Sequence, residues 1–85
     1  MMPRRITTGH ARELVRDALL KAMPGADLDS VDEGENIRDA LELDSLDFLT
    51  FVEQLGDAAG VRIDEDDYDQ LTTIKSSVEY LTRLP

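Results

Sequence analysis

The chain contains no cysteine and no tryptophan, and its aromatic residues are limited to two phenylalanines and two tyrosines. Without cysteine, it has neither a disulfide framework nor a thiolate zinc site. Proteins of this size are stabilised by a well-filled apolar core, by disulfides or by a structural metal ion. Aliphatic side chains must therefore provide most of the core of this 85-residue chain.

Histidine is almost absent, because His10 is the only one. A histidine-based metal site or a Ser–His catalytic pair would need more partners than this. The acidic run at residues 64–69 lacks the glycine and the ligand spacing of an EF-hand. We therefore read His10 as a surface residue near the first helix, and we predict no metal site and no enzyme activity.

Long apolar runs are also missing. No stretch approaches the roughly 18 apolar residues that a membrane span requires. The segment Met1–His10 has arginines but no apolar run after them, so it does not resemble a secretory signal. We expect one domain over residues 1–85, located in the cytoplasm, with no stable membrane insertion.

Basic residues are scarce: nine oppose 19 acidic residues, for a net charge of -10. Residues 1–22 carry five basic and two acidic side chains, a net of +3, whereas residues 23–85 carry four basic and 17 acidic ones, a net of -13. Such a surface repels nucleic acid and anionic lipid, and it attracts proteins that bear basic patches. A charged surface kept only for solubility is the alternative reading of the same composition.

Apolar residues recur at helical spacing in three segments, expected at about residues 8–22, 44–59 and 72–84. The sequence Met23-Pro24-Gly25 should end the first helix. Asp44 suits the N-cap of the second helix, with Asp47 in its first turn, and Gly60 supplies its stop. The third helix should begin at Thr72 or Thr73 and bury one apolar face.

The connections look irregular. Residues 23–43 are polar and acidic, so we expect a long functional loop that contains one short turn at Ile37–Leu41. Residues 61–70 crowd five carboxylates, and we expect only one helical turn there, capped by Asp64. No segment alternates as a strand would. The sequence thus predicts an all-α four-helix bundle with three main helices, one short helix and a long loop between helices 1 and 2.

The segment Asp44-Ser45-Leu46-Asp47 is the part of the sequence that indicates chemistry. A serine in the first turn of a helix lies beside free N–H groups and the positive end of the dipole, which favours a phosphate on its hydroxyl. The two carboxylates would repel a bare phosphate unless a cation or a basic partner relieved the repulsion. We therefore expect Ser45 to be modified in the presence of another protein. The alternative is that Ser45 merely caps the helix.

An apolar side chain lies on the polar face of the same helix. Leu46 falls in one column with Thr50, Glu53 and Asp57. A single exposed leucine is ordinary, but an apolar residue rimmed by carboxylates also fits the centre of a protein contact.

The segment Leu43-Asp44-Ser45-Leu46-Asp47 resembles the attachment motif of acyl carrier proteins. The resemblance continues through Val61-Arg62-Ile63-Asp64, Leu71-Thr72-Thr73-Ile74 and Tyr80-Leu81, and it covers about two thirds of the chain. It implies that a phosphopantetheinyl transferase moves 4′-phosphopantetheine from coenzyme A onto Ser45. Acyl groups would then be carried as thioesters on the terminal thiol of this arm.

The resemblance also implies the partners. It places Asp44 and Asp47 at the contact with the transferase. Enzymes of fatty-acid, polyketide or specialised lipid biosynthesis that bear basic patches would be recognised by Leu46, Thr50, Glu53 and Asp57. It further implies a cleft between the helices that shelters an acyl chain, and we expect a monomer.

Several positions depart from the family pattern. Glu42 stands where the family often has glycine, Thr50 stands at a commonly acidic position, and Glu53 stands at a commonly apolar one. These departures leave the pathway open and point to a specialised carrier. Two alternatives remain at this stage. One is an aminoacyl or peptidyl carrier, against which Asp44 argues, and the other is an unmodified helical interaction module.

Overall fold

The computed structural model describes residues 6–84. Arg4, Arg5 and Pro85 lie outside the described residues, as does the first half of the segment Met1–His10, in which we predicted no secretory signal. The four α-helices are α1 (Thr8–Ala22), α2 (Ile37–Ala40), α3 (Ser45–Ala59) and α4 (Ile74–Thr82), and two 3₁₀ helices are η1 (Leu28–Ser30) and η2 (Glu65–Leu71). No strand is formed within residues 6–84. The predicted all-α fold, with three main helices, one short helix and a long connection between the first two main helices, is confirmed.

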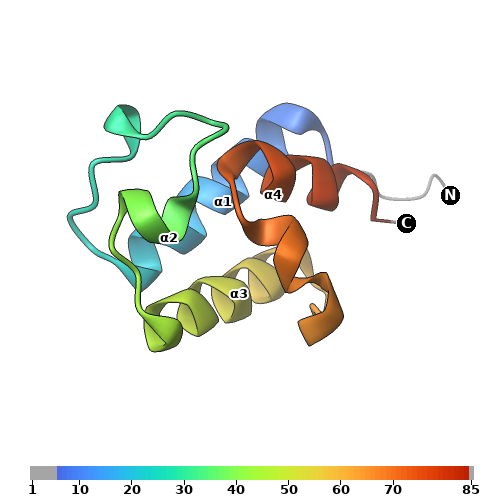
Figure 1. The fold of residues 1–85 in the computed structure, drawn as a ribbon. Coiled ribbons are helices and arrows are strands. Elements are labelled where there is room, and N and C mark those ends of the chain that lie inside the picture. The colour runs from blue at the N-terminus through green and yellow to red at the C-terminus, as the bar shows by residue number, and fades with distance from the viewer. Residues whose placement is uncertain (1–5, 85) are drawn as a thin grey trace, which may run out of the picture.

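The first helix lies at the centre of the arrangement, because α1 packs against both α3 and α4. Figure 1 shows the connection between α1 and α2 running out to one side before it returns to α2 above the start of α3. Side chains from all the main helices meet in one apolar core. Its fully buried members include Val15 and Leu19 of α1, Phe51 and Leu55 of α3, and Leu81 of α4.

Local capping fixes the ends of α1 and α3 where the sequence predicts them, whereas α4, Ile74–Thr82, is shorter than the predicted 72–84 because Thr73 caps its start. The side chain of Thr7 accepts a hydrogen bond from the His10 amide at 3.2 Å at the start of α1, and His10 is exposed within that first turn. Gly60 follows α3 with a φ of 73°, a left-handed conformation that glycine adopts without a steric penalty. These ends set the position of the residues at the start of α3.

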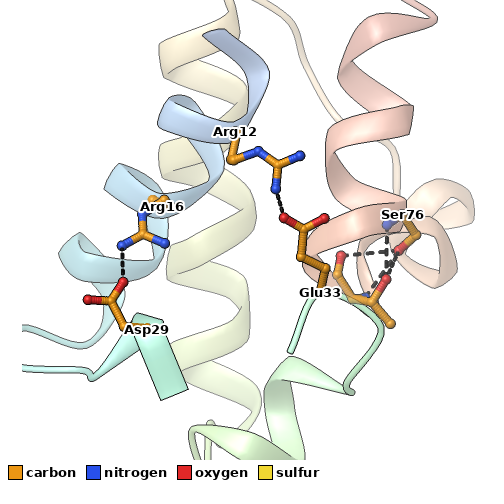
Figure 2. Close-up of polar contacts among 6 residues, drawn as sticks. Arg12, Arg16, Asp29, Glu33 and Ser76 are labelled. Carbon is orange, nitrogen blue, oxygen red and sulfur yellow. Dashed lines mark hydrogen bonds and ion pairs between the residues drawn. The ribbon is translucent and has the colours of Figure 1, made fainter. Parts of the chain in front are cut away.

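Two ion pairs fasten the long connection to α1. The guanidinium of Arg12 pairs with Glu33, and that of Arg16 pairs with Asp29 at 3.0 Å. Figure 2 shows both arginines reaching from α1 toward the connection. All four side chains are substantially exposed, so each pair contributes less than about 1 kcal/mol. The pairs orient the connection more than they stabilise the fold.

Backbone hydrogen bonds tie the end of this connection to the start of α4. The Lys75 amide donates to the Glu33 carbonyl, and the Ile37 amide donates to the Thr72 carbonyl, each at 2.9 Å. The start of α2 is therefore held against the residues that join η2 to α4. Residues from the start of α2 and from η2 thereby line one hollow together with residues of α3.

The segment after α3 differs from the expectation of one turn capped by Asp64. A seven-residue 3₁₀ helix, Glu65–Leu71, forms instead, and the side chain of Asp64 makes no capping hydrogen bond. Leu71 is fully buried, Tyr68 packs against the core, and Asp67 accepts a hydrogen bond from α4. These tertiary contacts offset the repulsion between neighbouring carboxylates, which the sequence pattern alone overweighted.

Candidate functional site

Ser45 is the first residue of α3, and its side chain is exposed. Asp44 performs the capping, because its Oδ1 accepts a hydrogen bond from the Asp47 amide at 2.8 Å. The Ser45 hydroxyl forms no hydrogen bond with any residue between positions 6 and 84. The capping explanation for Ser45 is thus ruled out by geometry: the neighbouring aspartate caps the helix and leaves the hydroxyl free.

The Ser45 side chain borders an open hollow of about 520 Å³. Ser45, Phe48 and Leu49 form the α3 wall, since residues three and four positions apart share one face of a helix. The remaining lining comes from the start of α2 and from η2 with the residue after it: Asn36, Arg38, Glu65, Tyr68, Asp69 and Thr72.

Aromatic rings form the floor of this hollow. The rings of Phe48 and Tyr68 meet edge to face, with centroids 5.8 Å apart, and Phe51 lies 6.1 Å from Phe48. The guanidinium carbon of Arg38 lies 5.2 Å from the centroid of the Phe48 ring, which is cation–π distance. The hollow therefore combines an apolar floor with a cationic edge beside the serine.

The η2 wall is fastened to α4 by one hydrogen bond. The Tyr80 hydroxyl donates to Oδ2 of Asp67 at 3.0 Å. Burial raises the pKa of Tyr80, and the hydrogen bond to Asp67 and the charges of Asp67 and Asp64 raise it further. The neutral hydroxyl is the form that fits this position, because a phenolate would face two carboxylates.

The predicted recognition residues lie along the solvent side of α3. Leu46 is 73% exposed, Glu53 and Asp57 are exposed, and Thr50 is half-buried. The Thr50 hydroxyl donates to the Leu46 carbonyl at 3.0 Å, one turn earlier in the helix. Leu49, 41% exposed, extends the apolar surface of Leu46 to a second residue. Leu49 was not among the predicted recognition residues, although its three-residue spacing from Leu46 indicates a shared surface.

A second hollow of about 510 Å³ lies toward the other end of α3. Glu53 and Asp57 border it together with Arg62. The two residues thus belong both to the solvent side of α3 and to the rim of this polar depression. The family resemblance implies a cleft between the helices for an acyl chain, but it names no lining residues. The residues that border these two hollows were not predicted, because each hollow is made by segments that are distant in the sequence.

Residues 6–84 contain neither a cluster of metal ligands nor a membrane-spanning helix. No set of three or more histidine, aspartate and glutamate side chains is placed to hold a metal ion. No helix in the described part of the chain has both the length and the apolar character needed to cross a membrane.

Comparisons with known proteins agree with the motif. A family model described as "Phosphopantetheine attachment site" matches residues 13–81. The acyl carrier protein of Lactobacillus acidophilus is 34% identical over 55 residues, and that of Lactobacillus johnsonii is 36% identical over 55 residues; each match covers 65% of this chain and 69% of the relative. The solved acyl carrier protein from Enterococcus faecalis superimposes with a TM-score of 0.66 at 26% identity, over 85% of this chain and 94% of that one.

Proposed function

We propose, since this chain belongs to the acyl carrier protein family, that the Ser45 hydroxyl is the attachment point of its 4′-phosphopantetheine arm. Carriage of acyl groups on covalently bound 4′-phosphopantetheine is the function of this family and of this chain. The single observation that carries the assignment to Ser45 is its exposed hydroxyl at the first turn of α3, which forms no hydrogen bond within residues 6–84.

The chemistry requires an accessible oxygen and a place for a phosphodiester. In the transfer, the Ser45 oxygen bonds to the phosphorus that bears pantetheine, and the nucleotide part of coenzyme A leaves with the bridging pyrophosphate oxygen. The hydroxyl proton passes to a base on the transferase. The first turn of α3 favours the resulting negative charge through its N–H groups and helix dipole. The adjoining hollow of about 520 Å³ leaves room for the arm.

Acyl carrier proteins interact with phosphopantetheinyl transferases and with biosynthetic enzymes. For this chain we place the transferase contact at Asp44 and Asp47, which flank Ser45. Leu46 would insert into an apolar depression of each partner, while carboxylates around it meet basic side chains. A small contact of this kind suits a carrier that must release each partner quickly.

The recognition surface would continue along α3 through Thr50, Glu53 and Asp57. The exposure of Glu53 and Asp57 supports this placement, as does the net charge of -13 over residues 23–85, whereas half-buried Thr50 is placed there by its position between Leu46 and Glu53 on the same helix face. We further propose that residues 1–85 form a monomeric, non-catalytic carrier domain that works in the cytoplasm. Its pathway would be fatty-acid, polyketide or specialised lipid biosynthesis.

Intact-mass measurement tests the attachment site. The protein is incubated with coenzyme A and a broad-specificity phosphopantetheinyl transferase, and its mass should rise by one phosphopantetheine. Ser45→Ala should abolish the increase, while Ser30→Ala, which removes another exposed serine hydroxyl, should not. No increase in the parent chain, or an equal increase in Ser45→Ala, would show an unmodified interaction module or a different attachment residue.

A matched pair of leucines tests the recognition surface. Leu46→Ala should lower the kcat/KM of the transferase about tenfold, as expected for loss of a contact that contributes between 1 and 2 kcal/mol. Leu20→Ala removes another exposed leucine, 39% exposed, from α1, and it should leave the rate unchanged. Equal rates for the two variants would remove Leu46 from the contact without affecting the assignment of Ser45.

A further inference from the structure

Arg38 has an unusual position for a cation in this protein. Among the residues of the described range 6–84 that line the hollow beside Ser45, it is the only basic one. It is also the only basic residue between Lys21 and Arg62 in the sequence. Its guanidinium carbon lies 5.2 Å from the centroid of the Phe48 ring.

The guanidinium of Arg38 is left without a carboxylate partner among residues 6–84. Arg12 and Arg16 of α1 form ion pairs, whereas Arg62, in another acidic segment, resembles Arg38 in forming none within residues 6–84. A free cation in a strongly acidic segment has many carboxylates to choose from, so the absence of a pair here leaves its N–H donors available. Stacking on an aromatic face holds the planar guanidinium while its N–H groups remain free to bind an anion.

The position of Phe48 brings Arg38 close to the modification site. Ser45 and Phe48 are three residues apart in α3, so they are neighbours on one helix face, with Cβ atoms about 5–6 Å apart. Arg38 lies over the ring of Phe48 and borders the same hollow as Ser45. An anion attached to the Ser45 oxygen would therefore lie on the side of α3 where the guanidinium is found.

We propose that Arg38 is a positioning residue that binds the phosphodiester of the arm on Ser45; this inference rests on the function proposed above. Phosphodiester oxygens accept hydrogen bonds from guanidinium N–H groups, and such charge-assisted bonds are the stronger class. Arg38 supplies, within the chain itself, a cation that offsets the repulsion between the phosphodiester and the carboxylates of Asp44 and Asp47. The arm is thereby directed over the hollow and toward Tyr68.

A merely structural role for Arg38 predicts something different. If the guanidinium only stabilises the Phe48 ring, its removal lowers the stability of the unmodified and the modified protein equally. If it binds the phosphodiester, its removal lowers the stability of the modified protein more. The test is therefore a cycle that compares apo and holo forms of the parent chain and of Arg38→Gln. Arg62→Gln is the matched control, because it removes an exposed arginine from the second hollow, near the other end of α3.

Three measurements are made on each apo and holo pair, after intact mass and Ser45→Ala have established modification at Ser45. The Arg38 Nε–Hε resonance of the parent chain should shift when the arm is attached. The ³¹P resonance of the holo protein should move in Arg38→Gln and stay in place in Arg62→Gln. The apo-to-holo change in melting temperature should be lower by about 2–4 °C in Arg38→Gln, as expected for one exposed charged contact in a domain of this size.

Arg38→Lys guards against a folding defect, because it keeps the positive charge without the planar fork. It should retain part of the apo-to-holo change. The inference is overturned if Ser45 is modified while the Arg38 resonance stays in place and the two glutamine variants give the same apo-to-holo differences. If the mass does not rise, or rises in Ser45→Ala, the proposed function itself fails and this inference fails with it.

Discussion

Tyr80 and Asp67 join α4 to η2 through a hydrogen bond of 3.0 Å between the phenol oxygen and Oδ2. Burial raises the pKa of Tyr80, with further contributions from the bond to Asp67 and from the charges of Asp67 and Asp64. The protonated hydroxyl therefore stabilises the folded state. Its contribution is complete below the pKa of an unfolded tyrosine, about 10, and is lost as the pH rises through the higher folded value.

Tyr80→Phe should lower the free energy of unfolding by about 1 kcal/mol near pH 8, because it removes this hydrogen bond. Above about pH 10 the parent chain should lose stability more steeply than the variant, since only the parent has a Tyr80 proton to release. Urea unfolding between these pH values measures both effects. Tyr68→Phe is the control, and it leaves Tyr80 as the single tyrosine for an absorbance titration. A Tyr80 midpoint at or below 10 would contradict the prediction.

Gly56 should not tolerate a side chain. The chain turns back after α3, and a Cβ at this buried residue would lie 2.8 Å from the Val61 carbonyl oxygen. The Val61 amide also donates to the Gly56 carbonyl at 2.9 Å, so the two backbones cannot separate without losing this bond. Gly56→Ala should therefore lower the free energy of unfolding by about 1–3 kcal/mol, as measured by urea denaturation.

Gly9→Ala is the matched control for Gly56→Ala. Gly9 also lies in a helix, but a Cβ there meets nothing within 4 Å. Alanine should be neutral there or stabilise the chain by up to about 1 kcal/mol through its higher helix propensity. A Gly56→Ala variant as stable as Gly9→Ala would mean that the turn after α3 adjusts freely.

The sequence was sufficient for features that depend on neighbouring residues. Asp44 was predicted as the cap of α3, and the spacing of apolar residues gave the bounds of α1 and α3, because capping and helical period are local properties. Because Asp44 caps the helix, the Ser45 hydroxyl is not needed for capping. These local signals explain why the start of α3 could be identified before its surroundings were known.

Features that depend on distant segments were not predictable in this way. The cation–π contact between Arg38 and Phe48 joins α2 to α3, and the hydrogen bond from Tyr80 of α4 to Asp67 joins α4 to η2. No periodicity or motif marks either contact. The one available signal was that Arg38 is a lone cation in an acidic stretch of the sequence. Its role can be inferred only once the structure places it over the ring of Phe48.

The concentration of negative charge should make stability sensitive to salt. Residues 23–85 carry a net charge of -13, and their mutual repulsion acts over about 30 Å at 0.01 M salt but only about 3 Å at 1 M. The melting temperature should rise across this range of sodium chloride and on addition of millimolar magnesium. Asp66→Asn, at an exposed residue of η2, should raise the melting temperature at low salt and reduce its salt dependence. A flat response of the parent chain would show that self-repulsion is unimportant.

Glu42 adopts a left-handed backbone conformation just before the start of α3. Its φ is 54°, and it is the only residue other than glycine with a positive φ between positions 6 and 84. This conformation costs a residue with a side chain roughly 1–2 kcal/mol, whereas glycine adopts it readily. Glu42 stands where related carriers often have glycine, so the departure noted in the sequence falls on a strained position. The strain is stored in the turn that sets the position of Ser45.

Replacement of Glu42 by glycine should therefore stabilise the fold. Glu42→Ala is the matched control, because it removes the same carboxylate and keeps the side-chain strain. The free energy of unfolding of Glu42→Gly should exceed that of Glu42→Ala by about 1 kcal/mol. This difference is the strain that glycine relieves minus the cost of the greater conformational entropy of glycine in the unfolded chain. Urea denaturation of both variants measures the difference. If alanine equals or exceeds glycine, the turn before Ser45 does not hold residue 42 in the left-handed region.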